Sequence, residues 1–72
     1  MPETLLELGK ALNVSGDAGA ASGYLEEALK SEQNGTLAQA VHLQLLQAYR
    51  KLGRTADAER ELEAVRKLRG NK

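Results

Sequence analysis

The chain has 72 residues, with ten acidic and ten basic side chains, so its net charge is zero. A chain of this length forms at most one small domain, and a neutral chain has no general attraction for nucleic acid or an anionic membrane. The lack of cysteine excludes disulfides and thiolate metal sites, and no apolar run approaches the ~20 residues that cross a bilayer. The first ten residues do not have the pattern of a secretory signal. We therefore expect a soluble chain, cytoplasmic by default, with no membrane partner.

The composition favours helices over strands. The only aromatic side chains are two tyrosines, and valine is scarce. No stretch alternates apolar and polar residues for long enough to indicate a strand. A core of leucine, alanine and valine suits close contact between helices, so the sequence predicts an all-α fold.

A first helix is predicted from Pro2, because proline suits the first turn of a helix, where its missing N–H is no loss. Apolar residues and one glycine recur at helical spacing along one side: Leu5, Leu8, Gly9 and Leu12. The run Ser15-Gly16-Asp17 is expected to end this helix and begin the next. The Asp17 side chain can accept hydrogen bonds from the free N–H groups of that next helix.

The second helix is predicted to bury one face of small and apolar side chains. These are Ala18, Ala21, Leu25, Ala28 and Leu29. We expect the helix to end near Ser31, because Gln33-Asn34-Gly35 is typical of a loop. Gly19 and Gly23 lower its helix propensity, and this pair predicts close contact with a neighbouring helix.

Thr36 and Gln39 have the spacing of a capping box and predict the start of a third helix. Its apolar arc holds Ala38, Val41, Leu45, Leu46, Tyr49 and Leu52. Gly53 is expected to end this helix in a left-handed conformation. Thr55 is then predicted to cap a fourth helix. The apolar positions of that helix are Ala58, Leu62, Val65 and Leu68.

The second pair of helices repeats the first at an offset of 37 residues. Five pairs match at this offset: Gly16 with Gly53, Ala21 with Ala58, Leu25 with Leu62, Leu8 with Leu45, and Leu12 with Tyr49. Glycines at these places let the chain reverse, and small side chains let helix axes approach to about 8 Å. Internal repetition is the strongest signal in the chain.

The stretches LLELGKAL…GDAGAASGYLEEAL and LQLLQAYRKLGRTADAERELEAV resemble consecutive tetratricopeptide repeats, a family whose unit is a helix pair of ~34 residues. In the first unit, the family's packing positions match Leu8, Gly9, Leu12, Gly16, Ala21, Leu25 and Ala28. In the second unit, they match Leu45, Tyr49, Gly53, Ala58 and Leu62. The chain departs from the family at Leu46 and Val65, which replace smaller residues, and it lacks the family's proline near the end of each unit.

The resemblance implies a single domain over residues 1–72, with repeat one over about 2–34, repeat two over about 36–69 and a frayed tail at 70–72. It implies four antiparallel helices in an α-solenoid with right-handed superhelical stacking. It also implies a protein-interaction function, because the first helix of each pair lines a concave groove in solenoids of this type.

Six residues are expected to face that groove and contact a protein or peptide partner: Leu6, Lys10, Asn13, Leu43, Gln47 and Arg50. Leu6 and Leu43 lie about 100° away from the packed arcs, so packing within a helix pair does not explain them. The alternative is that both are partly exposed leucines without a role. The favoured function is a scaffold or adaptor that holds its partner in a shallow groove.

The sequence holds no catalytic or metal-binding pattern. His42 is the only histidine and has no second histidine or cysteine to complete a metal site, so we interpret it as a packing residue. The glutamates of the second and fourth helices are expected on solvent faces. We therefore expect no enzyme activity, no metal and no cofactor.

Charge is unevenly distributed along the chain. Residues 1–36 hold six acids and two bases, a net charge of −4, whereas residues 37–72 hold four acids and eight bases, a net charge of +4. Repeat arrays usually need at least ~3 units, so one alternative to the groove is that the pair caps a longer array. The charge asymmetry adds two more: a repeat pair that associates with itself as a homo-oligomer, or a basic surface for nucleic acid. The last is the least favoured, because acids interleave the bases and aromatic stacking residues are nearly absent.

Overall fold

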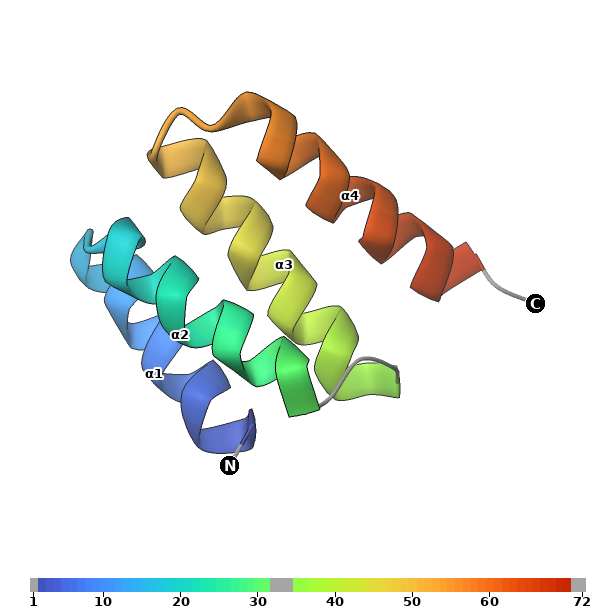
Figure 1. Cartoon of the computed structure of the whole chain (residues 1–72), viewed down its shortest axis with the longest axis horizontal. Coiled ribbons are helices and arrows are strands. Elements are labelled where there is room, and N and C mark those ends of the chain that lie inside the picture. The colour runs from blue at the N-terminus through green and yellow to red at the C-terminus, as the bar shows by residue number, and fades with distance from the viewer. Residues whose placement is uncertain (1, 32–34, 71–72) are drawn as a thin grey trace.

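The computed structural model describes residues 2–31 and 35–70, which form four α-helices and no strand (Figure 1). The helices are α1 (Pro2–Ser15), α2 (Ala18–Ser31), α3 (Gly35–Lys51) and α4 (Thr55–Gly70). The prediction of an all-α fold is confirmed. None of these helices combines the length and the apolar character needed to cross a bilayer.

The turn between α1 and α2 is closed by two backbone hydrogen bonds. Gly16 N–H donates to the carbonyl of Asn13 at 3.2 Å, and Asp17 N–H donates to the carbonyl of Leu12 at 2.8 Å. Gly16 has a φ of 96°, in the left-handed region that favours glycine. The Asp17 carboxylate accepts a hydrogen bond from the N–H of Ala20 at 3.3 Å, so its predicted capping role is confirmed.

The turn between α3 and α4 repeats this arrangement. Gly53 N–H donates to the carbonyl of Arg50 at 3.1 Å, and Arg54 N–H donates to the carbonyl of Tyr49 at 2.9 Å. Gly53 has a φ of 75°, as predicted for a left-handed terminal residue. The prediction that Thr55 caps α4 is wrong, because Thr55 is already helical and Arg54 occupies the place that Asp17 has in the first turn.

The start of α3 also differs from the prediction. The helix begins at Gly35, so Thr36 lies inside its first turn instead of preceding it. Residues 33–34 of the predicted loop and residues 71–72 of the predicted tail lie outside the described part of the chain. Gly70, which we expected to fray, is the last residue of α4.

The helices form two hairpins that lie side by side. Helix α1 packs against α2, and α3 packs against α4; in addition, α3 contacts both α1 and α2 (Figure 1). Among the described helices, the backbone of α4 approaches only that of α3. The molecule measures 35 × 28 × 17 Å, which makes it a flattened slab.

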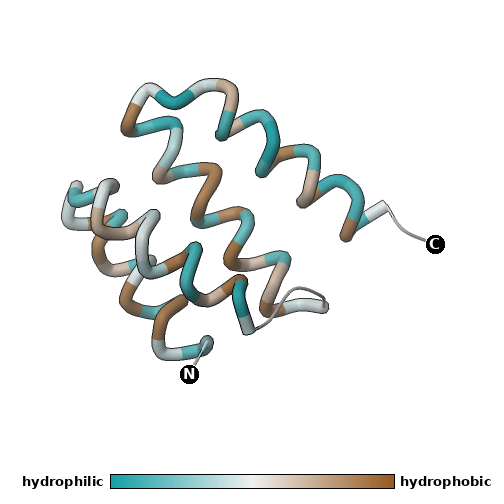
Figure 2. Tube along the Cα trace, in the orientation of Figure 1, coloured by the Kyte–Doolittle hydropathy of each residue, from teal (hydrophilic) through white to brown (hydrophobic). Residues whose placement is uncertain are grey.

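The core is built from leucine and small side chains. Its fully buried members include Ala21, Leu25 and Ala28 of α2, with Val41 and Leu45 of α3. Helix α4 adds little, since only Ala58 and Val65 are buried there, and most of its length is hydrophilic (Figure 2). The centre of the core therefore lies where α2 meets α3.

Close approach of α1 to α2 depends on Gly9. A Cβ placed on Gly9 would lie 2.5 Å from Cγ and Cδ2 of Leu25, well inside van der Waals contact. Gly19 and Gly23 behave differently, because a Cβ on either would meet no atom within 4 Å. The prediction that these two glycines mark a close helix contact is wrong.

Two leucines assigned to the packed arcs are exposed instead of buried. Leu8 is 39% exposed, and Leu52 is 41% exposed. Leu5 and Leu12 are half-buried and pack against the core, as predicted. The buried side of α1 is therefore rotated relative to the predicted arc, and its centre lies near Leu6 and Gly9.

Candidate interaction surface

The structure divides the six predicted groove residues into two groups. Leu6 and Asn13 are buried, with exposed fractions of 6% and 2%. The other four are exposed: Lys10, Leu43, Gln47 and Arg50. The prediction that Leu6 and Asn13 lie open in a groove is wrong. Their repeat-equivalent residues in α3, Leu43 and Arg50, are exposed.

Contact with α3 explains why Leu6 and Asn13 are buried. The Asn13 side chain donates through Nδ2 to the backbone carbonyl of Gln44 at 3.1 Å and to the Gln44 side-chain oxygen at 3.0 Å. The Lys51 ammonium donates to the backbone carbonyl of Asn13. Residues 6 and 13 are seven apart and share one side of α1. That side faces α3, whereas Gly9 faces α2.

One of the exposed groove residues of α3, Arg50, lines a hollow between α3 and α4. The hollow measures about 350 Å³ and is lined by Leu46, Arg50, Thr55, Ala58, Glu59 and Leu62. Leu43, Gln47 and Arg50 follow one another at helical spacing on one side of α3, and Arg50 connects this side to the hollow. We call this surface the α3–α4 face and define it by Leu43, Leu46, Gln47, Arg50, Glu59 and Leu62.

Lys10 does not join this surface. It lies on α1, with its ammonium 3.8 Å from the Glu7 carboxylate, and both side chains are about half exposed or more. An exposed pair of this kind contributes little to stability. The α1 part of the predicted groove therefore retains one of its three residues in an accessible position.

His42 has a carboxylate partner that sequence spacing did not indicate. Its Nδ1 lies 2.6 Å from Glu61 Oε1, and the two side chains are only 17% and 12% exposed. An ionised carboxylate only accepts hydrogen bonds, so the imidazole donates. The prediction that Glu61 lies on a solvent face is wrong, because its position on α4 places it against α3. The sequence places His42 and Glu61 on separate helices, and no spacing rule relates residues on separate helices, so this contact could not be predicted.

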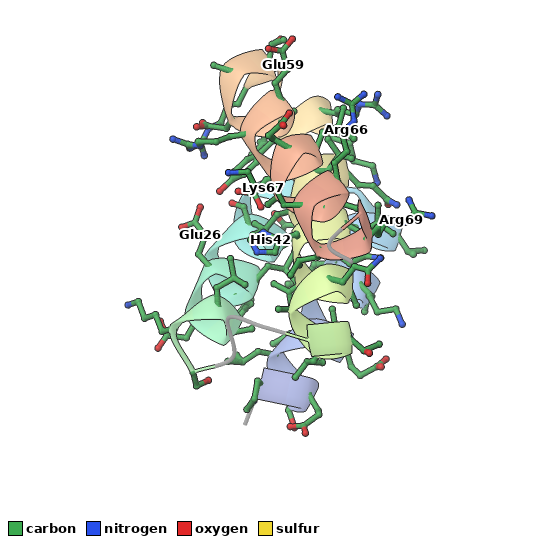
Figure 3. The ribbon with its side chains drawn as sticks, turned by 90° about the vertical axis from the view of Figure 1, so that its right-hand side faces the viewer. Glu26, His42, Glu59, Arg66, Lys67 and Arg69 are labelled. Carbon is green, nitrogen blue, oxygen red and sulfur yellow. The ribbon has the colours of Figure 1, made fainter. Side chains whose placement is uncertain are left out.

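A second polar link joins α3 to α2. The buried Tyr49 hydroxyl donates to the Glu26 carboxylate, and the Arg54 guanidinium lies 4.6 Å from the centre of the tyrosine ring. Burial raises the pKa of the Tyr49 phenol well above its usual value, and the hydrogen bond to Glu26 and the nearby negative charges raise it further. Figure 3 views this side of the molecule from α4, with Glu26 and His42 labelled.

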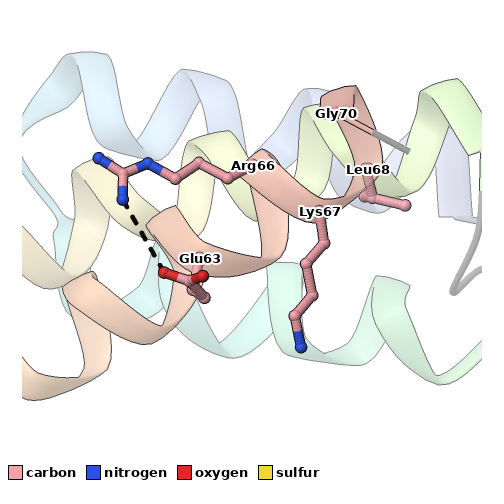
Figure 4. Close-up of a pocket in the computed structure, with 5 residues that line it drawn as sticks. All are labelled: Glu63, Arg66, Lys67, Leu68 and Gly70. Carbon is pink, nitrogen blue, oxygen red and sulfur yellow. Dashed lines mark ion pairs between the residues drawn. The ribbon is translucent and has the colours of Figure 1, made fainter. Parts of the chain in front are cut away.

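The basic side chains of α4 are interleaved with acids. Asp57 accepts from Arg54 at 2.8 Å and also from Arg60, and Arg66 lies 3.9 Å from Glu63. The last pair borders a hollow at the end of α4 that Lys67 also lines (Figure 4). These side chains are mostly exposed, an arrangement typical of a solvated helix face.

No group of three or more metal-ligating side chains gathers within residues 2–31 and 35–70. Comparisons of this chain with models of protein families, with curated proteins and with solved structures find no match.

Proposed function

We propose that this chain is a protein-interaction module built from two tandem helix pairs of the tetratricopeptide type. Support comes from the two turns, whose hydrogen bonds and left-handed glycines recur at the same offset of 37 residues. Further support comes from α1 and α3, the first helices of the two pairs, which contact one another. Repeats that stack through neighbouring units form a solenoid, and we expect right-handed stacking.

The α3–α4 face is the surface on which we place the partner, and Leu43 is the observation that carries this assignment. Its side chain is 42% exposed, although four residues of the same helix are fully buried. Arg50 stands on the same side of the helix and lines the hollow with Leu46 and Leu62. An exposed leucine and a cation on one side of α3, with a hollow lined by both apolar and charged side chains, suit an amphipathic segment that carries an acidic residue.

A photoreactive residue tests whether this face contacts protein. p-Benzoylphenylalanine replaces Leu43 in one variant and Leu52 in another, and both are irradiated in cells that make the chain. The two leucines have nearly equal exposure, 42% and 41%. Leu43 lies on α3, whereas Leu52 lies in the turn that follows it and is not part of the α3–α4 face, so Leu52 is a matched control.

We expect covalent adducts with polypeptide from position 43 and few from position 52. Mass spectrometry of the adducts identifies the partner. Equal labelling at the two positions, or no adduct from position 43, contradicts the proposed surface.

A further inference from the structure

Within this chain, α3 of the second hairpin covers one face of the first hairpin, which α1 and α2 form. Leu6 and Asn13 of α1, together with Ser22 and Leu25 of α2, are buried in the first hairpin, which α3 contacts through both of its helices. The hydrogen bonds from Asn13 to Gln44 fix the register of this contact. The first hairpin therefore has a docking face that is already occupied by a helix of the same chain.

The same face recurs on the second hairpin, where no described helix covers it. A shift of 37 residues converts the four buried positions into Leu43, Arg50, Glu59 and Leu62. All four belong to the α3–α4 face, and three of them line its hollow. Leu43, Arg50 and Glu59 are exposed and Leu62 is half-buried, although their counterparts are buried.

The complementary side also recurs, on α1. Helix α3 carries Val41, Leu45 and Ala48 on its buried side, and all three are fully buried. The equivalent positions of α1 are Thr4, Leu8 and Ala11. These three are exposed, and Glu7, the counterpart of Gln44, is exposed beside them. We call Thr4, Glu7, Leu8 and Ala11 the outer side of α1.

Charge favours contact between these two open surfaces. The neutral pair of Asn13 and Gln44, which joins the hairpins, corresponds to Arg50 and Glu7. In the repeat-equivalent arrangement, a guanidinium therefore meets a carboxylate. The surfaces also come from opposite halves of the chain, which carry net charges of +4 and −4. Opposite potentials favour this pairing and disfavour the contact of either surface with its own copy.

We propose that the partner of the α3–α4 face is a second copy of this chain, which docks head to tail. The outer side of α1 of one copy lies on the α3–α4 face of another, in the way that α3 lies on α1 and α2 within the chain. This proposal rests on the proposed function, because it names the occupant of the same surface. Each pair of copies leaves one surface of each kind open, so the contact is heterologous and adds further copies.

Two blocked variants test the head-to-tail arrangement. Leu8→Glu places a charge on the outer side of α1, and Leu43→Glu places one on the α3–α4 face. Sedimentation velocity is measured over a range of concentrations for the wild type, for each variant alone and for an equimolar mixture. Far-UV circular dichroism verifies that each variant is folded. If Leu8→Glu does not fold, Ala11→Glu replaces it, and if Leu43→Glu does not fold, Arg50→Glu replaces it.

For the wild type, we expect a mass that rises with concentration beyond that of a dimer. Each blocked variant alone is expected to be monomeric. The mixture is expected to form one-to-one pairs and no larger species, because each variant retains the surface that the other lacks. Leu52→Glu and Tyr24→Glu, at similarly exposed positions outside both surfaces, are expected to associate as the wild type does.

Exchange of the charged pair tests the register. Glu7→Arg alone and Arg50→Glu alone are each expected to weaken association by about tenfold or more, since like charges then face one another. A mixture of the two variants is expected to recover most of the wild-type association. The double variant Glu7→Arg/Arg50→Glu keeps the net charge of the chain at zero. Its recovery of association distinguishes the Arg50–Glu7 contact from a general effect of net charge.

Several results overturn the proposal: a monomeric wild type at every concentration, a wild type that stops at a dimer, or a mixture of blocked variants that stays monomeric while the wild type associates. The variant with the photoreactive residue at position 43 distinguishes failure of the head-to-tail proposal from failure of the proposed function. An adduct with a different protein and a monomeric chain leave the proposed function standing and refute the second copy as occupant. An adduct with the chain itself supports both.

Discussion

Asn13 and Gln44 join the first helix of the chain to the third through two hydrogen bonds, one to a backbone carbonyl and one to a side-chain oxygen. Asn13 is 2% exposed, and its own Oδ1 is buried without a hydrogen-bond partner in the described structure. The contact between hairpins therefore includes a polar link whose removal has a measurable cost.

Asn13→Ala is expected to lower the free energy of unfolding by about 2 kcal/mol, because it removes both hydrogen bonds and leaves a small cavity. Urea denaturation followed by circular dichroism measures the change. Val14→Ala is the control: Val14 is the next residue and is 88% exposed, so we expect a change within about 0.5 kcal/mol. Equal effects of the two substitutions would contradict the assigned role of Asn13.

Replacement of a helical glycine in the first hairpin by alanine is expected to change the stability of the fold in a direction that depends on the position. Gly9→Ala is predicted to destabilise the fold by about 1–3 kcal/mol, since the new Cβ overlaps the Leu25 side chain. Gly19→Ala and Gly23→Ala are predicted to stabilise it by roughly 1 kcal/mol each, because the space there is open and alanine favours the helix. Thermal denaturation of the three single variants gives the comparison. A stabilising effect at position 9 would mean that α1 and α2 do not approach as described.

Tyr49 gives the fold a dependence on alkaline pH. Its pKa in the folded state is raised by burial, by the hydrogen bond to Glu26 and by nearby negative charge, whereas an unfolded tyrosine titrates near 10. A raised pKa stabilises the fold fully below pH ~10 and loses that contribution as the pH rises further. We expect the free energy of unfolding to fall more steeply above pH ~10 in the wild type than in Tyr49→Phe.

A spectroscopic titration tests directly whether the pKa of the Tyr49 phenol is raised in the folded protein. In a Tyr24→Phe background, Tyr49 is the only tyrosine, and the ultraviolet absorbance of tyrosinate reports its ionisation directly. Ionisation at the usual value in the folded protein would show that Tyr49 is not buried beside Glu26.

The pair of His42 and Glu61 is expected to contribute more than any exposed ion pair of α4. A double-mutant cycle with His42→Ala and Glu61→Ala should give a coupling free energy of about 1 kcal/mol or more, because both side chains are largely buried. The matched cycle uses Glu63 and Arg66, whose side chains are 62% and 69% exposed, and should give no more than about 0.5 kcal/mol. Similar coupling in both cycles would contradict a buried link between α3 and α4.

Local sequence signals predicted the elements of the fold well. The apolar period gave four helices, the glycines at 16 and 53 gave the two turns, and the offset of 37 residues predicted that these turns match. Each of these features depends on residues that are close in the sequence, so they can be recognised without knowledge of the tertiary packing.

The burial of individual side chains could not be predicted in the same way, because it depends on contacts between residues that are far apart in the sequence. The predicted arc of α1 assumed a single neighbour, whereas α1 packs against both α2 and α3, which buries Leu6 and Asn13 and leaves Leu8 exposed. Likewise, the Glu61 side chain is only 12% exposed, because α4 places it opposite His42. A helical period locates an apolar stripe but does not tell how many helices cover it.

Helix α3 touches all three other helices, whereas the backbone of α4 approaches α3 alone. Detachment of α4 therefore breaks one interface, whereas release of α3 breaks three and leaves only the contact between α1 and α2. Amide protons of α4 should exchange with solvent through partial opening, and those in the middle of α3 only through global unfolding. Each opening of α4 also uncovers His42 on α3, so this buried histidine becomes accessible without loss of the first hairpin.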